Sequence, residues 1–300
     1  MRTGRVAASR ASVERAAAAD DNILREGMAA IEHQRPDEAE RIARGVLARR
    51  PQHPRALQLL GVALLAQKRG REAVVPLSEA ARGTADPIVE TQLAAALRES
   101  GRTAEALTWL ERATARAPPF VPAFHELGIV LCSLRRFAEA QAALERGLAI
   151  EPTAAELSVQ LGGVFINRAD PANAKVAFAR ALAQAPGHPR ALHGFGTALL
   201  YEGEFERAAE RFRQVLAKNP GHVRARLDLG HCLLELGRFD EAAECLRAMV
   251  AAAPQLYSKA LKVLVSAGHG RFWLRPSDAA AFLKRGSGTA PAPARERPPR

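Results

Sequence analysis

Histidine and glutamate are the residue types in this sequence that could do metal or acid–base chemistry. His125 and Glu126 begin an H-E-x-x-H pattern, which on a helix places two His side chains one turn apart to hold zinc, with the Glu as general base. The position of the second His is occupied by Ile129. The sequence also contains no G-x-S-x-G and no G-x-x-x-x-G-K-[ST] motif. We therefore expect no catalytic residues, no metal site and no cofactor.

The three cysteines, Cys132, Cys232 and Cys245, include no C-x-x-C pair. Each lies in a segment with helical periodicity, so we expect reduced, packed thiols. No apolar run approaches the roughly 18 residues of a membrane span, and the first twenty residues lack the apolar core of a secretory signal. These features favour a cytoplasmic protein. The Arg- and Ser-bearing N-terminus leaves an organellar transit peptide as the alternative.

A unit of 33 or 34 residues, copied seven times, must position all of these side chains. Its eighth residue is small and its twentieth is Ala, while large apolar residues recur at the seventh, eleventh and twenty-fourth positions. Spacings of three and four within each half indicate two amphipathic helices per unit. We expect Gly196 and Ala208 to face each other where two helices cross. The units begin at Asp20, Pro54, Pro87, Val121, Ala155, Pro189 and Val223.

Gly, Pro and His mark the joints of these units. Gly101, Gly203 and Gly237 stand between the two halves, where a helix C-terminal cap requires a left-handed residue. Asp170 and Pro171 form an N-cap followed by Pro in the first turn. Pro76, inside a second half, predicts a kink. The periodic recurrence of three histidines between units indicates a structural role for them: His53, His188 and His222.

The chain resembles the tetratricopeptide-repeat family. The resemblance rests on the length of the unit, the early Leu-Gly pair, the Ala midway and the closing Pro. The resemblance covers residues 20–256 and implies an all-α fold, a right-handed α-solenoid of seven helix-turn-helix repeats with a C-terminal capping helix. Trp is missing at the fourth position, where Leu57, Glu90 and Phe124 stand, and Glu26 replaces Leu in the first unit.

The expected organisation has four parts. A basic Ala/Arg-rich tail, possibly helical, covers residues 1–19. The repeats cover residues 20–256, as 20–53, 54–86, 87–120, 121–154, 155–188, 189–222 and 223–256. Residues 257–284 form the cap, and its aromatic segment Phe272–Leu283 folds over the last repeat or, alternatively, docks a partner. Residues 285–300, rich in Gly and Pro, are expected to be disordered.

The net charge of +11 raises the question of nucleic-acid binding. The short tails, residues 1–19 and 284–300, carry +3 and +4, which leaves only +4 on the repeats and cap. The resemblance implies a concave groove lined by positions 2, 5, 9, 12 and 13 of the first helices. Its charged members are four Arg and five acids, so the sequence indicates no phosphate track.

The groove positions instead combine apolar and hydrogen-bonding residues, which suits a peptide or helix segment of another protein. The family's clamp for the C-terminal carboxylate of chaperones is not matched. Tyr201 is the expected hot spot, unless it packs between the sixth and seventh units. The expected partner-binding residues are His125, Ile129, Val159, Gly163, Ile166, Asn167, His193, Thr197, Leu200, Tyr201, Arg224 and His231.

The sequence therefore predicts a non-enzymatic protein-interaction scaffold or adaptor, with no membrane span. The alternative is the recognition subunit of a catalytic system, with a transferase such as a sulfotransferase or glycosyltransferase on a separate chain.

Overall fold

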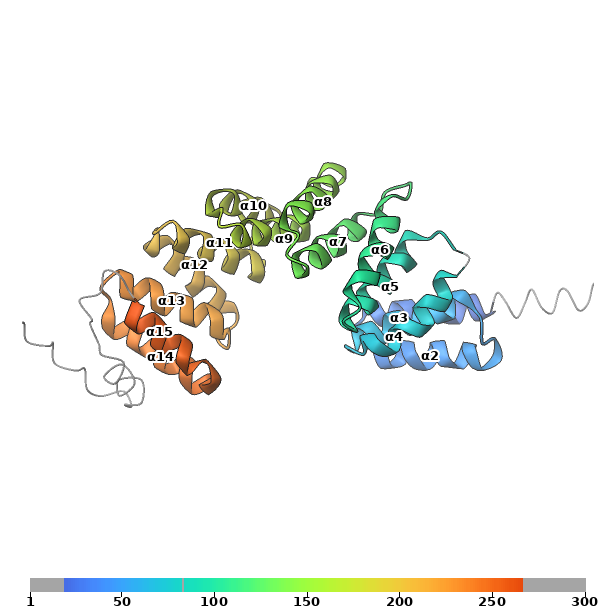
Figure 1. Cartoon of the computed structure of the whole chain (residues 1–300). Helices are drawn as coiled ribbons and strands as arrows, with labels where there is room; N and C mark the ends of the chain where they lie inside the picture. Colours follow the sequence, from blue (N-terminus) through green and yellow to red (C-terminus); the bar gives the residue numbers. More distant parts are fainter. Residues whose placement is uncertain (1–18, 83, 267–300) are drawn as a thin grey trace, which may run out of the picture. The chain divides into compact units, whose positions relative to one another are not determined.

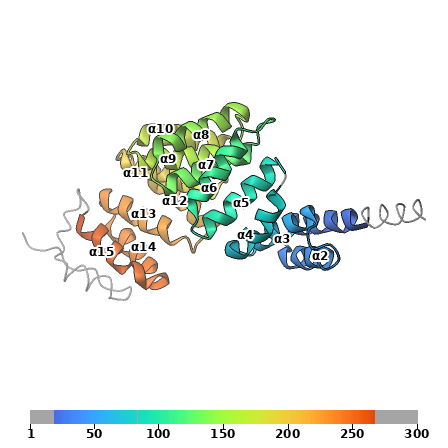
Figure 2. The same cartoon turned by 45° about the vertical axis from the view of Figure 1, so that its right-hand side comes forward.

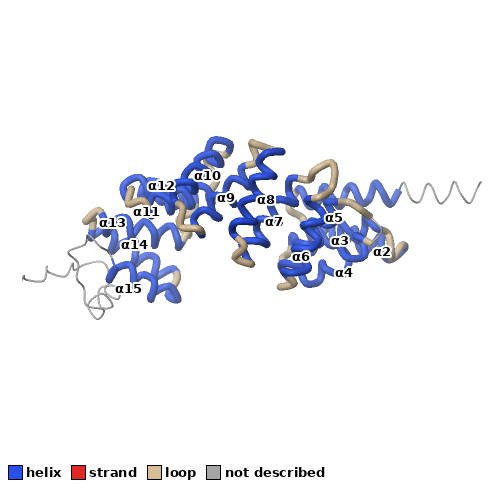
Figure 3. The backbone as a smooth tube through the Cα atoms, turned by 45° about the horizontal axis from the view of Figure 1, so that its top comes forward, coloured by secondary structure: helices blue, strands red, loops and turns tan. Residues whose placement is uncertain are grey.

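A computed structural model describes residues 19–82 and 84–266, and all regular elements in these ranges are helices (Figures 1 and 3). Residues 19–32 are helical. They are followed by α2 (Pro36–Arg49), α3 (Pro54–Ala66), α4 (Gly70–Ala81), α5 (Pro87–Glu99), α6 (Thr103–Thr114), α7 (Val121–Ser133), α8 (Phe137–Ile150), α9 (Ala155–Asn167), α10 (Pro171–Gln184), α11 (Pro189–Tyr201), α12 (Phe205–Lys218), α13 (Val223–Glu235), α14 (Phe239–Ala252), the 3₁₀ helix η1 (Pro254–Leu256) and α15 (Tyr257–Ser266).

The chain divides between Pro152 and Thr153 into two compact units, which we call the N-terminal unit and the C-terminal unit. Within each unit the helices pack in sequential antiparallel pairs, such as α3 with α4 and α11 with α12 (Figure 2). The first helices of successive repeats also contact one another: α3, α5 and α7 in one unit, α9, α11 and α13 in the other. Among the described residues, the second helices of successive repeats make no such contact. The first helices therefore line the inner side of each unit.

A left-handed residue ends the first helix of each repeat. Gly101, Gly203 and Gly237 have φ angles of +85°, +78° and +72°, as predicted. The next residue closes the helix with a hydrogen bond from its backbone N–H to the carbonyl five residues earlier, for example Arg102 to Leu97 at 2.8 Å. Four repeats adopt the same turn with a side chain present: Gln34, Lys68, Arg135 and Ala169, at φ 56° to 62°.

The small eighth residue of each unit lets the two helices of a repeat approach closely. A Cβ on Gly196 would lie 2.8 Å from the ring of Phe212, and one on Gly162 would lie 2.7 Å from the ring of Phe178. Gly61, Gly128 and Gly230 face Leu77, Leu144 and Leu246 in the same way. The nearest atoms to Gly196 belong to Phe212 rather than to the predicted Ala208, because the large side chain at position 24 reaches across the crossing point.

The three inter-repeat histidines cap helices. The Nδ1 atoms of His188 and His222 accept hydrogen bonds from the N–H groups of Ala191 and Ala225 at 3.1 and 3.0 Å, and His53 accepts from Ala56 at 3.4 Å. These contacts confirm the structural role that the periodicity predicted. Asp170 likewise accepts from the N–H of Asn173 at 3.1 Å, as expected for an N-cap.

The C-terminal part begins as predicted with a helix that covers the last repeat. α15 contacts α13 and α14, and its Ala260 and Leu264 are buried in one apolar cluster with Leu246 and Met249. α4 continues through Pro76 from Gly70 to Ala81, so the proline does not end the helix. The tail of residues 1–18, the segment Phe272–Leu283 and residues 285–300 lie outside the described residues.

Candidate functional site

The inner surface of each unit, formed by positions 2, 5, 9, 12 and 13 of the first helices, is the candidate site; we call it the first-helix face. Of the twelve predicted residues, His125 and Ile129 lie on α7 in the N-terminal unit and are half-buried. The other ten lie on α9, α11 and α13 in the C-terminal unit. The two groups belong to separate compact units and are described separately.

The polar and aromatic candidates at the C-terminal ends of α9 and α11 are open to solvent. Tyr201 is 59% exposed, so it does not pack between the sixth and seventh repeats. Asn167 is exposed, and its Nδ2 donates a hydrogen bond to the carbonyl of Gly163 at 2.8 Å. A Cβ on Gly163 would meet no atom within 4 Å, so the helix surface is open there. Ile166 is half-buried and Arg224 is exposed.

Three predicted residues are buried beneath this surface. Val159, Thr197 and Leu200 are 3%, 8% and 9% exposed. The hydroxyl of Thr197 donates to the carbonyl of His193 at 3.0 Å, within its own helix. These side chains pack between neighbouring helices and leave little surface that a ligand could touch.

His193 bridges the sixth and seventh repeats. Its Nε2 lies 2.9 Å from Oδ2 of Asp228 on α13, and its ring stacks at a tilt on His222, with centroids 5.1 Å apart. Burial, followed by the nearby His193, lowers the pKa of His222 below its usual 6.5. His231 lies 3.6 Å from Glu235 in its own helix. The side chain of His193 therefore joins repeats, while His231 is partly exposed.

Polar contacts between the first helices of successive repeats recur in both units. Arg55 pairs with Asp21 at 3.0 Å, and Nε of Arg98 lies 3.3 Å from Oε2 of Glu126. In the C-terminal unit Arg190 bonds Gln160 and lies 3.6 Å from Glu156. Sequence reasoning did not identify the sixth position of the unit, which supplies a partner in several of these contacts: Gln92, Glu126, Gln160 and Asp228.

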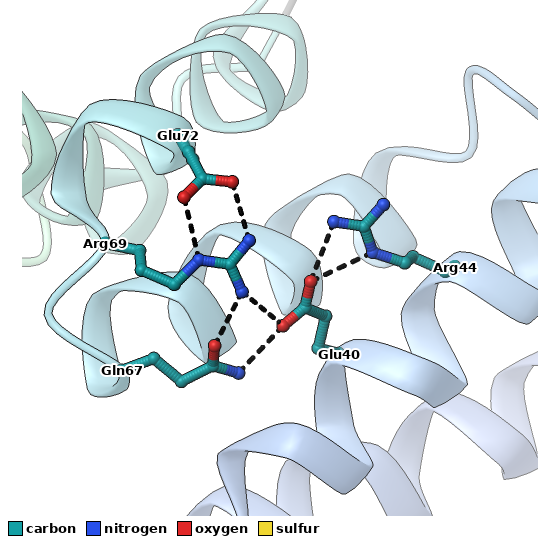
Figure 4. A network of polar contacts seen from close by, with 5 residues as sticks. All are labelled: Glu40, Arg44, Gln67, Arg69 and Glu72. Carbon is teal, nitrogen blue, oxygen red and sulfur yellow. Dashed lines mark hydrogen bonds and ion pairs between the residues drawn. The ribbon is translucent and has the colours of Figure 1, made fainter.

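A polar network joins the first two repeats (Figure 4). Arg69 forms two hydrogen bonds with Glu72, at 2.8 and 2.6 Å, and reaches Glu40 of the preceding repeat at 2.8 Å. Gln67 and Arg44 also donate to Glu40. The hydrogen bond from Gln67, followed by that from Arg44, lowers the pKa of Glu40 below its usual 4.5, against the opposing effect of burial.

The same three positions carry inverted charges between the fifth and sixth repeats. Lys175 occupies the position of Glu40, Glu204 that of Arg69, and Arg207 that of Glu72. Lys175 bonds Glu204 at 2.8 Å, and Arg207 bonds Glu204. The contact is thus retained while every sign is reversed. These networks join repeats and lie on the second helices and turns rather than on the first-helix face.

Glu90 is a buried carboxylate in the core of the third repeat. It is fully buried at the position where the family has Trp, and Arg112 and Arg116 bond its Oε1 at 3.1 and 2.8 Å. Two arginines compensate the desolvation of one carboxylate, which identifies this group as a structural ion pair.

The thiols are poor nucleophiles. Burial raises the pKa of Cys132 and Cys245 above 9.0 and that of Cys232 to about 12. The described residues contain no group of three His, Cys, Asp or Glu side chains arranged to hold a metal ion. None of the helices in residues 19–82 and 84–266 combines the length and hydrophobicity of a membrane span.

The fold and the first-helix faces define a helical-repeat scaffold of the kind that serves protein–protein interaction. Two models of the tetratricopeptide repeat match residues 24–87 and 199–264, so these segments of the chain contain repeats of that type. A search of curated protein sequences finds no significant match.

Solved structures support the same fold. The structure of PilF from Pseudomonas aeruginosa is 21% identical, covers 67% of this chain and 92% of its own, and has a TM-score of 0.60. A tetratricopeptide-repeat protein from Parabacteroides merdae is 15% identical, with 81% and 98% covered and a TM-score of 0.61. YrrB, described as having an unusual peptide-binding site, is 23% identical, with 63% and 97% covered and a TM-score of 0.52.

Proposed function

We propose that the chain is a non-enzymatic scaffold whose first-helix face in the C-terminal unit binds a peptide or helix segment of a partner protein. The observation that carries the proposal is Tyr201, a large aromatic side chain that stands 59% exposed on this face. Tyr combines a rigid apolar area with one hydroxyl, which is why it is enriched among interface hot spots.

The surroundings of Tyr201 suit an extended or helical chain. The open surface at Gly163 allows a partner backbone to approach α9. The Nδ2 of Asn167 is held by the carbonyl of Gly163, which fixes its Oδ1 as an acceptor for a partner N–H group. Ile166 supplies an apolar contact beside them.

The buried candidates form the floor of this surface. Val159 and Leu200 fill the space between the first helices, and the bridge from His193 to Asp228 holds α11 against α13. These residues position the exposed ones. Truncation of His193 should therefore lower thermal stability, whereas truncation of Tyr201 should not.

Capture of partners by the full chain, with their identification by mass spectrometry, tests the proposal when it is repeated with variants. We expect Tyr201→Ala to weaken binding of the captured segment by about thirtyfold or more, since hot-spot truncations cost about 2 kcal/mol or more. Val176→Ala is the matched control, because Val176 is 68% exposed on α10, a second helix of the same unit. Full binding by both Tyr201→Ala and Asn167→Ala would refute the proposed site.

The alternative, a recognition subunit that serves a transferase on another chain, would use the same surface. No feature of the described residues favours it over a general scaffold. A transferase among the captured proteins would support it.

A further inference from the structure

The first-helix face of the N-terminal unit is more apolar than its counterpart in the C-terminal unit. Met28 and Ile88 are 40% and 41% exposed at positions 9 and 2 of their repeats. Half-buried apolar side chains occupy other positions of this face: Ile31 on the helix of residues 19–32, Val62 and Leu65 on α3, Ala95 on α5 and Ile129 on α7. The helix of residues 19–32 shares an apolar cluster with α3, and α3, α5 and α7 contact one another in order, so these side chains lie along one continuous face. A surface of this kind is typical of a docking site for another chain.

The charges that remain on this face are negative. Its two arginines are engaged, Arg55 with Asp21 at 3.0 Å and Arg98 with Glu126 at 3.3 Å. Glu32 and Glu99 are exposed, and their side chains form no hydrogen bond or ion pair with another described residue.

The arginines that follow Glu32 and Glu99 in the sequence are also engaged elsewhere. Arg35 pairs with Glu38 at 2.8 Å, and Arg102 pairs with Glu105 at 2.6 Å. The two carboxylates therefore border the apolar face with uncompensated charge.

Both acids stand where their own helices disfavour them. Glu99 is the last residue of α5, and Glu32 is the last helical residue of its segment. A helix C-terminus carries partial negative charge, so a carboxylate there is destabilising by a few tenths of a kcal/mol. Glu99 lies against Gly70 at the start of α4, since a Cβ added to Gly70 would lie 2.5 Å from the Cβ of Glu99. The side chain of Glu99 is nevertheless exposed. A stabilising role within the fold does not explain these residues.

We propose that the N-terminal unit binds a basic amphipathic segment of a partner protein. The apolar side of the segment contacts Met28 and Ile88, and its Lys or Arg side chains pair with Glu32 and Glu99. Charge complementarity of this kind sets the choice of partner and its register more than the total affinity. This site is independent of the one proposed around Tyr201, and it differs from that site in binding a segment with positive charge.

Two synthetic helical peptides test the proposal against the full chain by fluorescence anisotropy. They share one leucine stripe and differ only in carrying Lys or Glu on the polar side. The protein has a net charge of +11, so non-specific attraction favours the Glu peptide. We expect the Lys peptide to bind more tightly, with an affinity that falls as salt is raised. A preference for the Lys peptide would therefore come from the charges of the binding face and not from the net charge of the chain.

Variants assign the preference to residues. The double variant Glu32→Gln/Glu99→Gln should weaken binding of the Lys peptide about three- to tenfold, the range expected for loss of two exposed ion pairs. Met28→Ser should also weaken it. Glu79→Gln/Glu151→Gln is the matched control, since both residues are exposed and lie outside the first-helix face. The Tyr201→Ala variant should bind the Lys peptide normally, which separates this site from the one proposed around Tyr201.

Three results would overturn the proposal. One is equal or tighter binding of the Glu peptide, and another is unchanged binding by Glu32→Gln/Glu99→Gln. The third is tighter binding of the Lys peptide after deletion of residues 286–300, because the chain's own basic tail would then be the occupant.

Discussion

At the scale of single residues, the turn inside each repeat shows how one backbone position constrains the choice of side chain. The same left-handed conformation is occupied by Gly in three repeats and by Gln34, Lys68, Arg135 and Ala169 in the others. A residue with a Cβ pays a steric penalty there that Gly avoids. The hydrogen bond from Asp170 to Phe165, at 2.9 Å, holds the turn nevertheless. The four turns that carry a side chain at this position are thus less stable than the same turn with Gly.

We expect Ala169→Gly to raise the free energy of unfolding and Gly203→Ala to lower it, each by about 1 kcal/mol. The two changes are reciprocal at equivalent positions of adjacent repeats, so each is the control for the other. Urea unfolding monitored by circular dichroism measures both. Stabilisation by Gly203→Ala would contradict the assigned backbone conformation.

His222 makes stability depend on pH. Its pKa is lowered in the folded state by burial and then by His193, so the unfolded state takes up a proton more readily. The contribution is therefore fully present above pH 6.5 and is lost as the pH falls through the folded-state pKa. Protonation of Nδ1 also removes the acceptor that caps Ala225.

We expect the free energy of unfolding to fall between pH 7 and pH 5.5 in the wild-type chain and to fall less in His222→Asn. Asn keeps an acceptor suited to the N-cap but does not titrate. Denaturant unfolding at several pH values supplies the comparison. Parallel pH profiles of the two proteins would show that His222 is not the titrating group.

At the scale of elements, the two networks with opposite charges indicate that a contact between neighbouring repeats requires complementary charges. Which of the two positions carries the positive charge differs from one junction to the other. Glu40 faces Arg69, whereas Lys175 faces Glu204 at the equivalent positions. Each pair is complementary only to its own neighbour. Like charges at either junction would disfavour the observed packing.

We expect Glu40→Lys and Lys175→Glu each to lower the Tm, because each places like charges across a repeat junction. Arg41→Glu is the control, since Arg41 is exposed on α2 and bonds no other described residue. Added salt should reduce the effect. A Tm for Glu40→Lys equal to that of the control would mean that the network does not stabilise the junction.

The helices and their turns could be predicted from sequence because period, Gly and Pro carry that information locally. The left-handed turn at Ala169 carries no such signal, and only its alignment with Gly203 reveals it. The site was less predictable. Leu200 and Tyr201 are adjacent, yet Leu200 is buried and Tyr201 is exposed. Helical periodicity alone does not determine which of two adjacent residues the neighbouring helices cover.

At the scale of the whole molecule, the last repeat requires a cover. Ala260 and Leu264 of α15 are buried against the apolar cluster of α13 and α14. Deletion of residues 257–300 should expose this cluster, lower the Tm and promote aggregation, because a terminal repeat needs a polar outer face. Deletion of residues 286–300 alone should not. Equal stability and solution behaviour of the two truncations, in thermal melts and light scattering, would show that α15 is dispensable.

The central claim is that partner segments bind on the first helices. Hydrogen–deuterium exchange of the full chain, with and without a segment captured through Tyr201, tests it most directly. Binding should slow exchange at the C-terminal ends of α9 and α11 and along α13, while α10, α12 and α14 exchange at unchanged rates. Protection confined to the second helices, with none on α9, α11 and α13, would contradict the account.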